Sequence, residues 1–119
     1  MDIGVCMSRS TLDEKLALRH DTKPEAAWNL RTWPRGFKRG EINRLYVAVE
    51  RTWRGYFTFK DALFNPRDRA VPYALLFDTS SWTPISPAPA PRFRGFTYDV
   101  PPSTRPSHPD TGTTRRQTT

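Results

Sequence analysis

The chain has 119 residues, a length that suits a single domain with one hydrophobic core. Its 19 Lys and Arg residues outnumber 12 Asp and Glu residues, and the formal net charge of +7 at pH 7 favours an anionic partner: nucleic acid, a membrane surface or an acidic protein. The single cysteine, Cys6, excludes an intramolecular disulfide and suits a reducing compartment. The sequence shows neither a signal peptide nor an apolar run of about 18 residues, so we expect a cytoplasmic protein with no membrane partner.

The first third of the chain is predicted to form two short helices. The stretch "TLDEKLALRH" is expected to be the first, because Thr11 and Glu14 have the spacing of a capping box. The stretch "TKPEAAWNLR" is expected to be the second, since Thr22 can cap it and a proline stands in its first turn.

Strands are predicted from residue 43 onward. The stretch "RLYVAVE" alternates with a period of two, and "RGYFTFK" follows after a tight reversal, so the two are expected to form a β-hairpin. Gly55 within the second strand indicates a bulge or a close backbone approach. A third strand, "YALLFD", is apolar on both faces and is expected to be central or covered on both sides. A last strand is expected in "RFRGFTYDV".

Two other stretches are predicted to be connections without a place in the sheet. In "DALFNPRDRAVP" the Asn-Pro pair indicates a turn. In "TSSWTPISPAPAP" the prolines favour an extended, polyproline-like run that cannot donate hydrogen bonds to a sheet. Because this run carries Trp82 and Ile85, we expect it to cross the surface of the core.

These elements predict an α+β fold in a single domain, residues 8–101, with short N-terminal helices packed on a small, curved, mainly antiparallel sheet. Residues 102–119 contain no large apolar side chain. Such a segment cannot offset the ordering entropy of its backbone, about 1–2 kcal/mol per residue. We therefore expect these residues to form a disordered basic tail.

A pattern of aromatic, arginine, glycine, aromatic occurs twice, in "WRGYFTF" and "FRGFTYD". Ordinary strand chemistry explains it, because aromatic residues pair across strands and glycine permits a bulge. Alternatively, the two arginine-glycine corners lie side by side and bind an anion. The sequence leaves both interpretations open.

The region from Arg31 to Arg54 holds seven cations and two anions, interleaved with aromatic residues. Cations neutralise phosphate, and a base stacked on an aromatic ring contributes about 1–3 kcal/mol. A solvated basic face over buried aromatic residues is the competing interpretation. The residues expected to contact nucleic acid are Arg35, Lys38, Arg39, Arg51, Arg54 and Arg94 through phosphate, and Trp33 and Trp53 through stacking.

The stretch "WPRGFKRGEINRLYVAVERTWRGYFTF", Trp33 to Phe59, resembles the PUA-like superfamily, in particular its ASCH branch. A basic loop is followed by the pair Gly40-Glu41, a hydrophobic strand, and a returning strand that carries Gly55. The resemblance covers about a quarter of the chain. It implies a small β-barrel with helices at its start, and binding of RNA or a modified nucleotide in a cleft beside the barrel.

Some ASCH members are hydrolases that use a lysine, a threonine and a glutamate, but no clear motif carries these roles over. Thr22 and Lys23 stand near the corresponding place, and Glu50 is only a nearby carboxylate. The sequence shows no nucleophile with a paired base, no ligand spacing around His20 or His108, and no glycine-rich phosphate loop. We therefore expect no cofactor, no metal and no catalytic residue.

Three functions remain open from the sequence. The first is a nucleic-acid-binding module, with RNA as the expected ligand. The second is a protein-interaction module that binds an acidic partner through its basic face and the run "ISPAPAP", which is already extended before binding. The third is a small hydrolase of the ASCH type, which would require a cleft that holds Lys23 and a carboxylate within hydrogen-bond reach.

Overall fold

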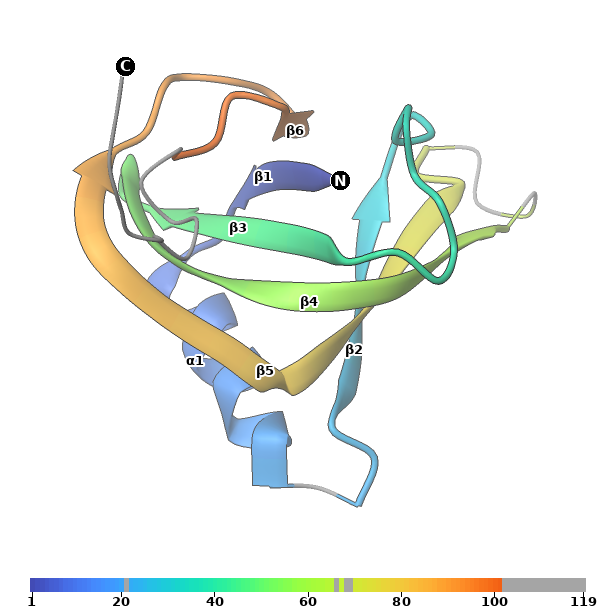
Figure 1. Cartoon of the computed structure of the whole chain (residues 1–119), viewed down its shortest axis with the longest axis horizontal. Coiled ribbons are helices and arrows are strands. Elements are labelled where there is room, and N and C mark those ends of the chain that lie inside the picture. Colours follow the sequence, from blue (N-terminus) through green and yellow to red (C-terminus); the bar gives the residue numbers. More distant parts are fainter. Residues whose placement is uncertain (21, 66, 68–69, 102–119) are drawn as a thin grey trace, which may run out of the picture.

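The protein is a small, mainly β domain with a six-stranded mixed sheet curled into a half-barrel (Figure 1). The computed structural model describes residues 1–20, 22–65, 67 and 70–101. Across these residues the elements are, in chain order, β1 (Asp2–Cys6), α1 (Arg9–Ala17), the 3₁₀ helix η1 (Leu18–His20), β2 (Glu25–Leu30), β3 (Asn43–Val49), β4 (Thr52–Phe64), β5 (Tyr73–Pro89) and β6 (Phe96–Thr97). The strand order is β2-β5-β4-β3-β1-β6. The pair β1 and β3 is parallel and the other pairs are antiparallel.

The expected second helix is wrong, because residues 25–30 form the edge strand β2. This strand pairs with β5 from Glu25 opposite Asp78 to Leu30 opposite Tyr73. Its apolar side chains alternate toward the core and Leu30 is buried. The cap and proline signals are local, and pairing with β5 overrides them.

The first helix is confirmed but begins earlier than the capping box indicates. Helix α1 has Ser8 as its N-cap, whose hydroxyl oxygen accepts a hydrogen bond from the Thr11 backbone N–H at 3.1 Å. Leu12 is its buried residue. The fold therefore has one short α-helix against the sheet in place of two, within the part of the chain described above.

Strand β1 was not expected, and the predicted domain start at residue 8 leaves it out. It lies inside the sheet, parallel to β3, with Val5 opposite Val47. Ile3 and Val5 are fully buried, which makes this strand part of the core. Gly4 lowers the strand propensity of this stretch, so propensity did not predict the strand. Glycine is needed there, because a side chain at this position would overlap the ring of Trp53.

Strands β4 and β5 are longer than predicted. They take in residues 61–64 of the first stretch assigned as a connection and residues 79–89 of the second, while residues 65–72 do connect the two strands. Residues 61–64 continue β4 and pair with residues 73–76 of β5. Further along, Pro84 lies opposite Gly55 and Pro89 opposite Thr52. The proline run is extended as expected, but its exclusion from the sheet is wrong. It is tolerated because β2 pairs only with residues 73–78 of β5, so the run has one strand beside it.

The expected last strand is reduced to β6, two residues long, opposite Gly4 and Val5. Gly95 precedes it with φ of +69°, a conformation that glycine adopts without strain. Gly55, in contrast, sits at a register shift in β4, and a Cβ atom there would lie 2.5 Å from the Thr83 carbonyl oxygen. Both effects expected of Gly55, a bulge and a close approach, are confirmed.

Two hydrophobic clusters cover the two faces of the sheet. The principal core joins β1 to β5 and α1, and includes Leu12, Leu30 and Phe57. Because edge strand β2 and inner strand β1 meet in one cluster, the sheet must curl toward that face. A smaller cluster of Tyr46, Trp53 and neighbours lies on the other face, packed by residues from β5 and the segment after it.

The β3–β4 hairpin turns through Glu50 and Arg51, whose φ values are 52° and 62°. A two-residue loop with both φ angles positive is a type I′ turn, which prefers Asn-Gly. Neither residue here is of the preferred type. The turn therefore stores strain of about 1–3 kcal/mol per residue.

We predict that Glu50→Asn raises the midpoint of thermal unfolding, because Asn tolerates the left-handed region better than Glu. The gain should be about 0.5–1 kcal/mol, measured by circular dichroism. The same exchange at exposed Glu14 in α1 is the control and should lower stability slightly, since Asn is the poorer helix former. Equal shifts of the same sign in both variants would contradict this account of the turn.

Candidate nucleic-acid interface

The eight residues predicted to bind nucleic acid lie at two ends of β3, in two sets. Residues 31–42, which we call the basic loop, enter β3 at Asn43 and carry Trp33, Arg35, Lys38 and Arg39. The other set lies around the opposite end, where Trp53 pairs with Ala48 of β3; it consists of Arg51, Trp53, Arg54 and Arg94. Strand β3 has seven residues, and at about 3.3 Å per residue the two ends are about 20 Å apart.

Trp33 belongs to a line of aromatic side chains that is partly open to solvent. Its ring makes edge contacts with Tyr73 at 5.5 Å and with Phe37 at 6.0 Å between centroids. The ring centroids of Phe64 and Tyr73 are 5.5 Å apart. Trp33 is 40% exposed and Phe64 is 60% exposed. We call Trp33, Phe37, Phe64 and Tyr73 the aromatic row.

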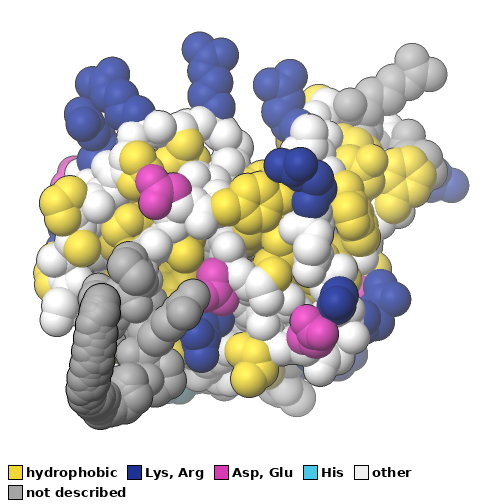
Figure 2. Space-filling view, turned by 45° about the horizontal axis from the view of Figure 1, so that its top comes forward, with side chains coloured by type: hydrophobic (Ala, Val, Ile, Leu, Met, Phe, Trp, Pro, Cys, Tyr) yellow, Lys and Arg dark blue, Asp and Glu magenta, His cyan; other side chains and the backbone are white. Residues whose placement is uncertain are grey.

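The aromatic row is anchored to the core through Phe37, which stacks on the buried Phe59 at 5.9 Å. Figure 2 shows one face of the molecule, on which hydrophobic side chains are exposed and Lys and Arg side chains project beside them. Sequence reasoning missed Phe64 and Tyr73 as site residues, because it assigned Phe64 to a connection and not to a strand paired with Tyr73. The pairing of β4 with β5 brings the two rings together.

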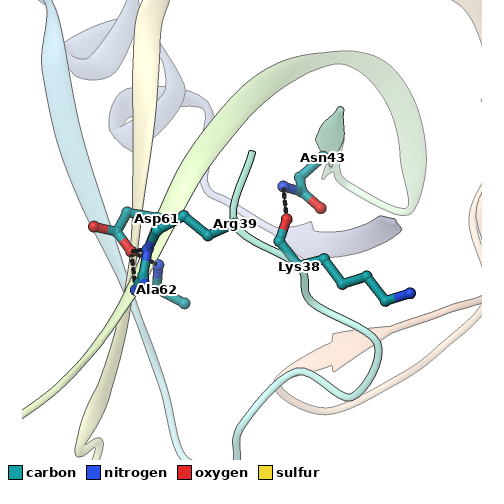
Figure 3. Close-up of polar contacts among 5 residues, drawn as sticks. All are labelled: Lys38, Arg39, Asn43, Asp61 and Ala62. Atoms are coloured by element: carbon teal, nitrogen blue, oxygen red, sulfur yellow. Dashed lines mark hydrogen bonds and ion pairs between the residues drawn. The ribbon is translucent and has the colours of Figure 1, made fainter. Parts of the chain in front are cut away.

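The basic loop has a defined backbone because Asn43 holds it (Figure 3). This side chain is 1% exposed, and its amide N–H groups donate to the carbonyl oxygens of Lys38 at 3.3 Å and Glu41 at 3.0 Å. Its Oδ1 accepts from the N-terminal ammonium of Met1 at 3.3 Å. A buried amide with all these partners positions the loop against the start of β3.

Arg39 is engaged by a carboxylate of the fold. Its Nε and Nη2 atoms donate to Oδ1 of Asp61 at 2.9 and 2.6 Å. The hydrogen bond from Arg39 lowers the pKa of the Asp61 carboxyl, helped by the Ala62 backbone N–H, while partial burial opposes the shift. Arg39 therefore carries less uncompensated charge toward a phosphate than the sequence implies.

Of the predicted binding residues, the other two cations of the basic loop, Arg35 and Lys38, stay available. The Arg35 guanidinium lies 5.8 Å from the ring centroid of Tyr98, and its backbone N–H donates to the Tyr98 hydroxyl at 2.8 Å. The Lys38 side chain points away from the pair of Arg39 and Asp61 (Figure 3). Arg35, Lys38 and the aromatic row thus form a basic and aromatic surface at one end of the half-barrel.

Trp53 cannot act as the expected stacking surface, because it is 2% exposed. Its ring stacks on Phe93 at 6.1 Å and meets Tyr46 edge to face at 6.3 Å. Trp53 and Phe93 are the first aromatic residues of the two repeated patterns. The repeats therefore meet through their rings, although Phe93 lies in the segment between β5 and β6 and not in a strand. Arg54 follows Trp53, and its Nε is buried without a hydrogen-bond partner among the residues that the structure places.

Arg51 and Arg94 line one hollow of about 430 Å³ with Cys6, Pro91, Arg92 and Phe93. We call these six residues the turn pocket. Two of the arginines selected from the sequence are thus brought together, while Arg54 does not line this hollow. Sequence reasoning missed Arg92 and Cys6 as members of the set, since the end of β1 meets residues 91–94 only through the curl of the sheet.

The hydrolase alternative has a cavity of its own, of about 460 Å³, lined by Lys23, Pro24, Glu25, Lys60 and Asp78. Both carboxylates already have partners. Oε2 of Glu25 lies 3.1 Å from Nζ of Lys60. Oδ1 of Asp78 accepts hydrogen bonds from the backbone N–H and the hydroxyl of Ser80. The cavity therefore lacks the contact between Lys23 and a carboxylate that this alternative requires.

Among the residues that the structure places, no group of three or more His, Cys, Asp or Glu side chains is arranged to hold a metal ion. None of the helices in that part of the chain has the length and hydropathy to cross a membrane.

We predict that Arg39→Gln raises the pKa of Asp61 toward its ordinary value, measured by NMR titration of the carboxyl carbon. Because the folded-state pKa of Asp61 is lowered, its stabilising contribution is present above the unfolded-state pKa and is lost as pH falls through the folded-state pKa. For an exposed pair that contribution is about 0.2–1 kcal/mol. The stability difference between the parent and Arg39→Gln should therefore be largest at neutral pH and vanish in acid.

Lys38→Gln is the matched control, because it removes the same charge from the neighbouring position without touching Asp61. It should leave the pKa of Asp61 nearly unchanged. An equal shift in both variants would mean that the carboxyl responds to the general charge of the loop and not to Arg39.

The sequence and the fold were compared with known proteins. The chain matches no protein-family model, and neither a curated protein nor a solved structure matches it significantly.

Proposed function

We propose that the protein is a nucleic-acid-binding module that takes single-stranded bases on the aromatic row, with RNA as the expected ligand. The observation that carries this proposal is the exposure of Trp33 beside two available cations. Its edge contacts with Tyr73 and Phe37 fix the orientation of the ring before any ligand arrives. A base stacked on such a ring contributes about 1–3 kcal/mol.

The charges around the aromatic row suit a phosphate backbone. Arg35 is oriented over Tyr98, and Lys38 projects from a loop whose backbone is held by Asn43. These groups bind phosphate through charge and stacking, and neither interaction distinguishes one base from another. The proposed binding is therefore tolerant of sequence and strongly dependent on salt.

We also propose that the half-barrel is a PUA-like domain of the ASCH type. The support is the stretch from Trp33 to Phe59, in which Gly40-Glu41 precedes β3 and Gly55 lies in β4 close to β5. This relation would place an RNA or modified-nucleotide ligand beside the half-barrel, in a cytoplasmic protein.

A protein-interaction role remains the alternative, and one observation favours it. Pro84, Pro87 and Pro89 of β5 are exposed, while Ile85 and Ala88 pack against the smaller cluster. The prolines thus present an extended edge that loses little entropy on binding. The hydrolase alternative rests only on the cavity around Lys23.

The test is the fluorescence anisotropy of labelled 12-nucleotide single strands of RNA and DNA at 50 and 200 mM salt. We predict that affinity falls steeply between these concentrations. Trp33→Ala should weaken binding about 5- to 150-fold, which corresponds to the loss of one stacked base. Lys38→Gln should lower the salt slope by about 1 for every sequence tested.

Arg39→Gln is the matched control, since Asp61 already compensates its charge, and it should change the salt slope less than Lys38→Gln does. Parent-like affinity in Trp33→Ala would remove the aromatic row from the proposal. Salt-independent affinity would exclude phosphate contacts. Retention of an acidic protein with no strand binding would favour the interaction alternative.

A further inference from the structure

The turn pocket holds three arginines and no carboxylate. It is formed where the end of β1, the β3–β4 turn and the segment after β5 meet, and Arg51, Arg92 and Arg94 line it. All three side chains belong to exposed residues. Neither an Asp nor a Glu is among the placed residues that line the hollow.

These guanidinium groups differ from that of Arg39, which the fold pairs with Asp61. In the part of the chain that the structure places, none of the three has a carboxylate partner. Three like charges around one hollow repel one another, and a bound anion would relieve that repulsion. Guanidinium groups present forked donors that match the oxygens of a phosphate in pairs.

A backbone hydrogen bond joins the two parts of the chain that carry these arginines. Arg51 sits in the strained type I′ turn with φ of 62°, and its carbonyl oxygen accepts from the Ala90 N–H at 2.8 Å. That bond ties the turn to the start of the segment that carries Arg92 and Arg94. Strain of this kind is concentrated at binding and active sites, where the surrounding structure enforces it.

The remaining walls suit a ligand with an aromatic or sugar part. Phe93 stacks on Trp53 and also lines the hollow. Burial raises the pKa of the Cys6 thiol, so at neutral pH the thiol is uncharged and adds no negative charge to the pocket. A volume of about 430 Å³ falls within the range of small-ligand sites, about 300–1,000 Å³.

We propose that the turn pocket binds a phosphate monoester, namely the terminal phosphate of a nucleotide that is either free or at the end of a strand. A monoester carries up to two negative charges, against one for each internal phosphate of a strand, so three arginines favour the terminal group. The pocket lies at the end of β3 opposite to Asn43, where the basic loop enters, and β3 is about 20 Å long. It does not depend on strand binding by the aromatic row.

Cys6 provides the test, because it is the only cysteine of the chain and it lines the pocket. The rate of its alkylation by neutral iodoacetamide is measured by intact mass in a phosphate-free buffer at pH 8. The ligands compared are AMP, adenosine, a hexanucleotide with a 5′-phosphate and the same hexanucleotide with a 5′-hydroxyl.

We expect AMP to slow alkylation severalfold and adenosine to leave it unchanged. Protection by the phosphorylated strand but not by the hydroxyl strand would identify the strand end as a source of the phosphate. Protection by AMP alone would restrict the source to free nucleotides. Equal effects of AMP and adenosine, or protection by neither AMP nor the phosphorylated strand, would overturn the proposal.

Arg94→Gln and Arg92→Gln should raise the AMP concentration that gives half protection about 10-fold or more, because each loses charged hydrogen bonds to the phosphate. Arg67→Gln is the control, since it removes the same charge from an exposed position between β4 and β5. Equal behaviour of all three variants would overturn the proposal.

A second readout needs no ligand. Anionic iodoacetate should react faster relative to iodoacetamide in the parent than in Arg94→Gln, because the arginines create a positive potential at Cys6. Trp33→Ala should keep full protection by AMP. A failure of strand binding at the aromatic row is therefore distinguishable from a failure of the turn pocket.

Discussion

The packing of Trp53 is the contact on which the smaller cluster, and with it one end of the molecule, depends. Its ring occupies the space that a side chain at Gly4 would fill, and it stacks on Phe93. One side chain of β4 therefore joins β1 and the segment after β5. A buried aromatic ring removes about 150–250 Å² from water, worth about 4–6 kcal/mol at about 25 cal/mol per Å².

The two ends of the half-barrel are consequently held by different forces. At the turn pocket, the apolar stack of Trp53 on Phe93 fixes the segment that carries Arg92 and Arg94. At the basic loop, hydrogen bonds from the buried Asn43 hold the backbone, and an exposed ion pair joins the loop to β4. The exposed pair weakens in high salt and in acid, whereas the stack of Trp53 on Phe93 contains no group that titrates.

The sequence predicts the β3–β4 hairpin well, because a period of two and the glycine at position 55 are local signals. It fails for β2, because its alanines and the preceding cap residues favour a helix, whereas pairing with β5 makes the segment a strand. It also fails for β1, where Gly4 lowers strand propensity for a reason that lies in Trp53, 49 positions away along the chain. For the candidate site, charge and aromatic content in the sequence select Trp33, Arg35 and Lys38. They also select Trp53, and only the structure shows that Trp53 is buried and cannot stack on a base.

The net charge of +7 does not show which cations are paired with a carboxylate in the folded protein. Arg39 and Lys60 find carboxylates 22 and 35 positions away, on strands that meet them only after the sheet has formed. Arg51, Arg92 and Arg94 gather at a hollow where the placed residues supply no carboxylate. Because like charges repel, bringing three of them together opposes folding unless something else offsets the repulsion. At the turn pocket the packing of Trp53 supplies that offset, and a bound anion would then interact with charges that no carboxylate among the placed residues neutralises.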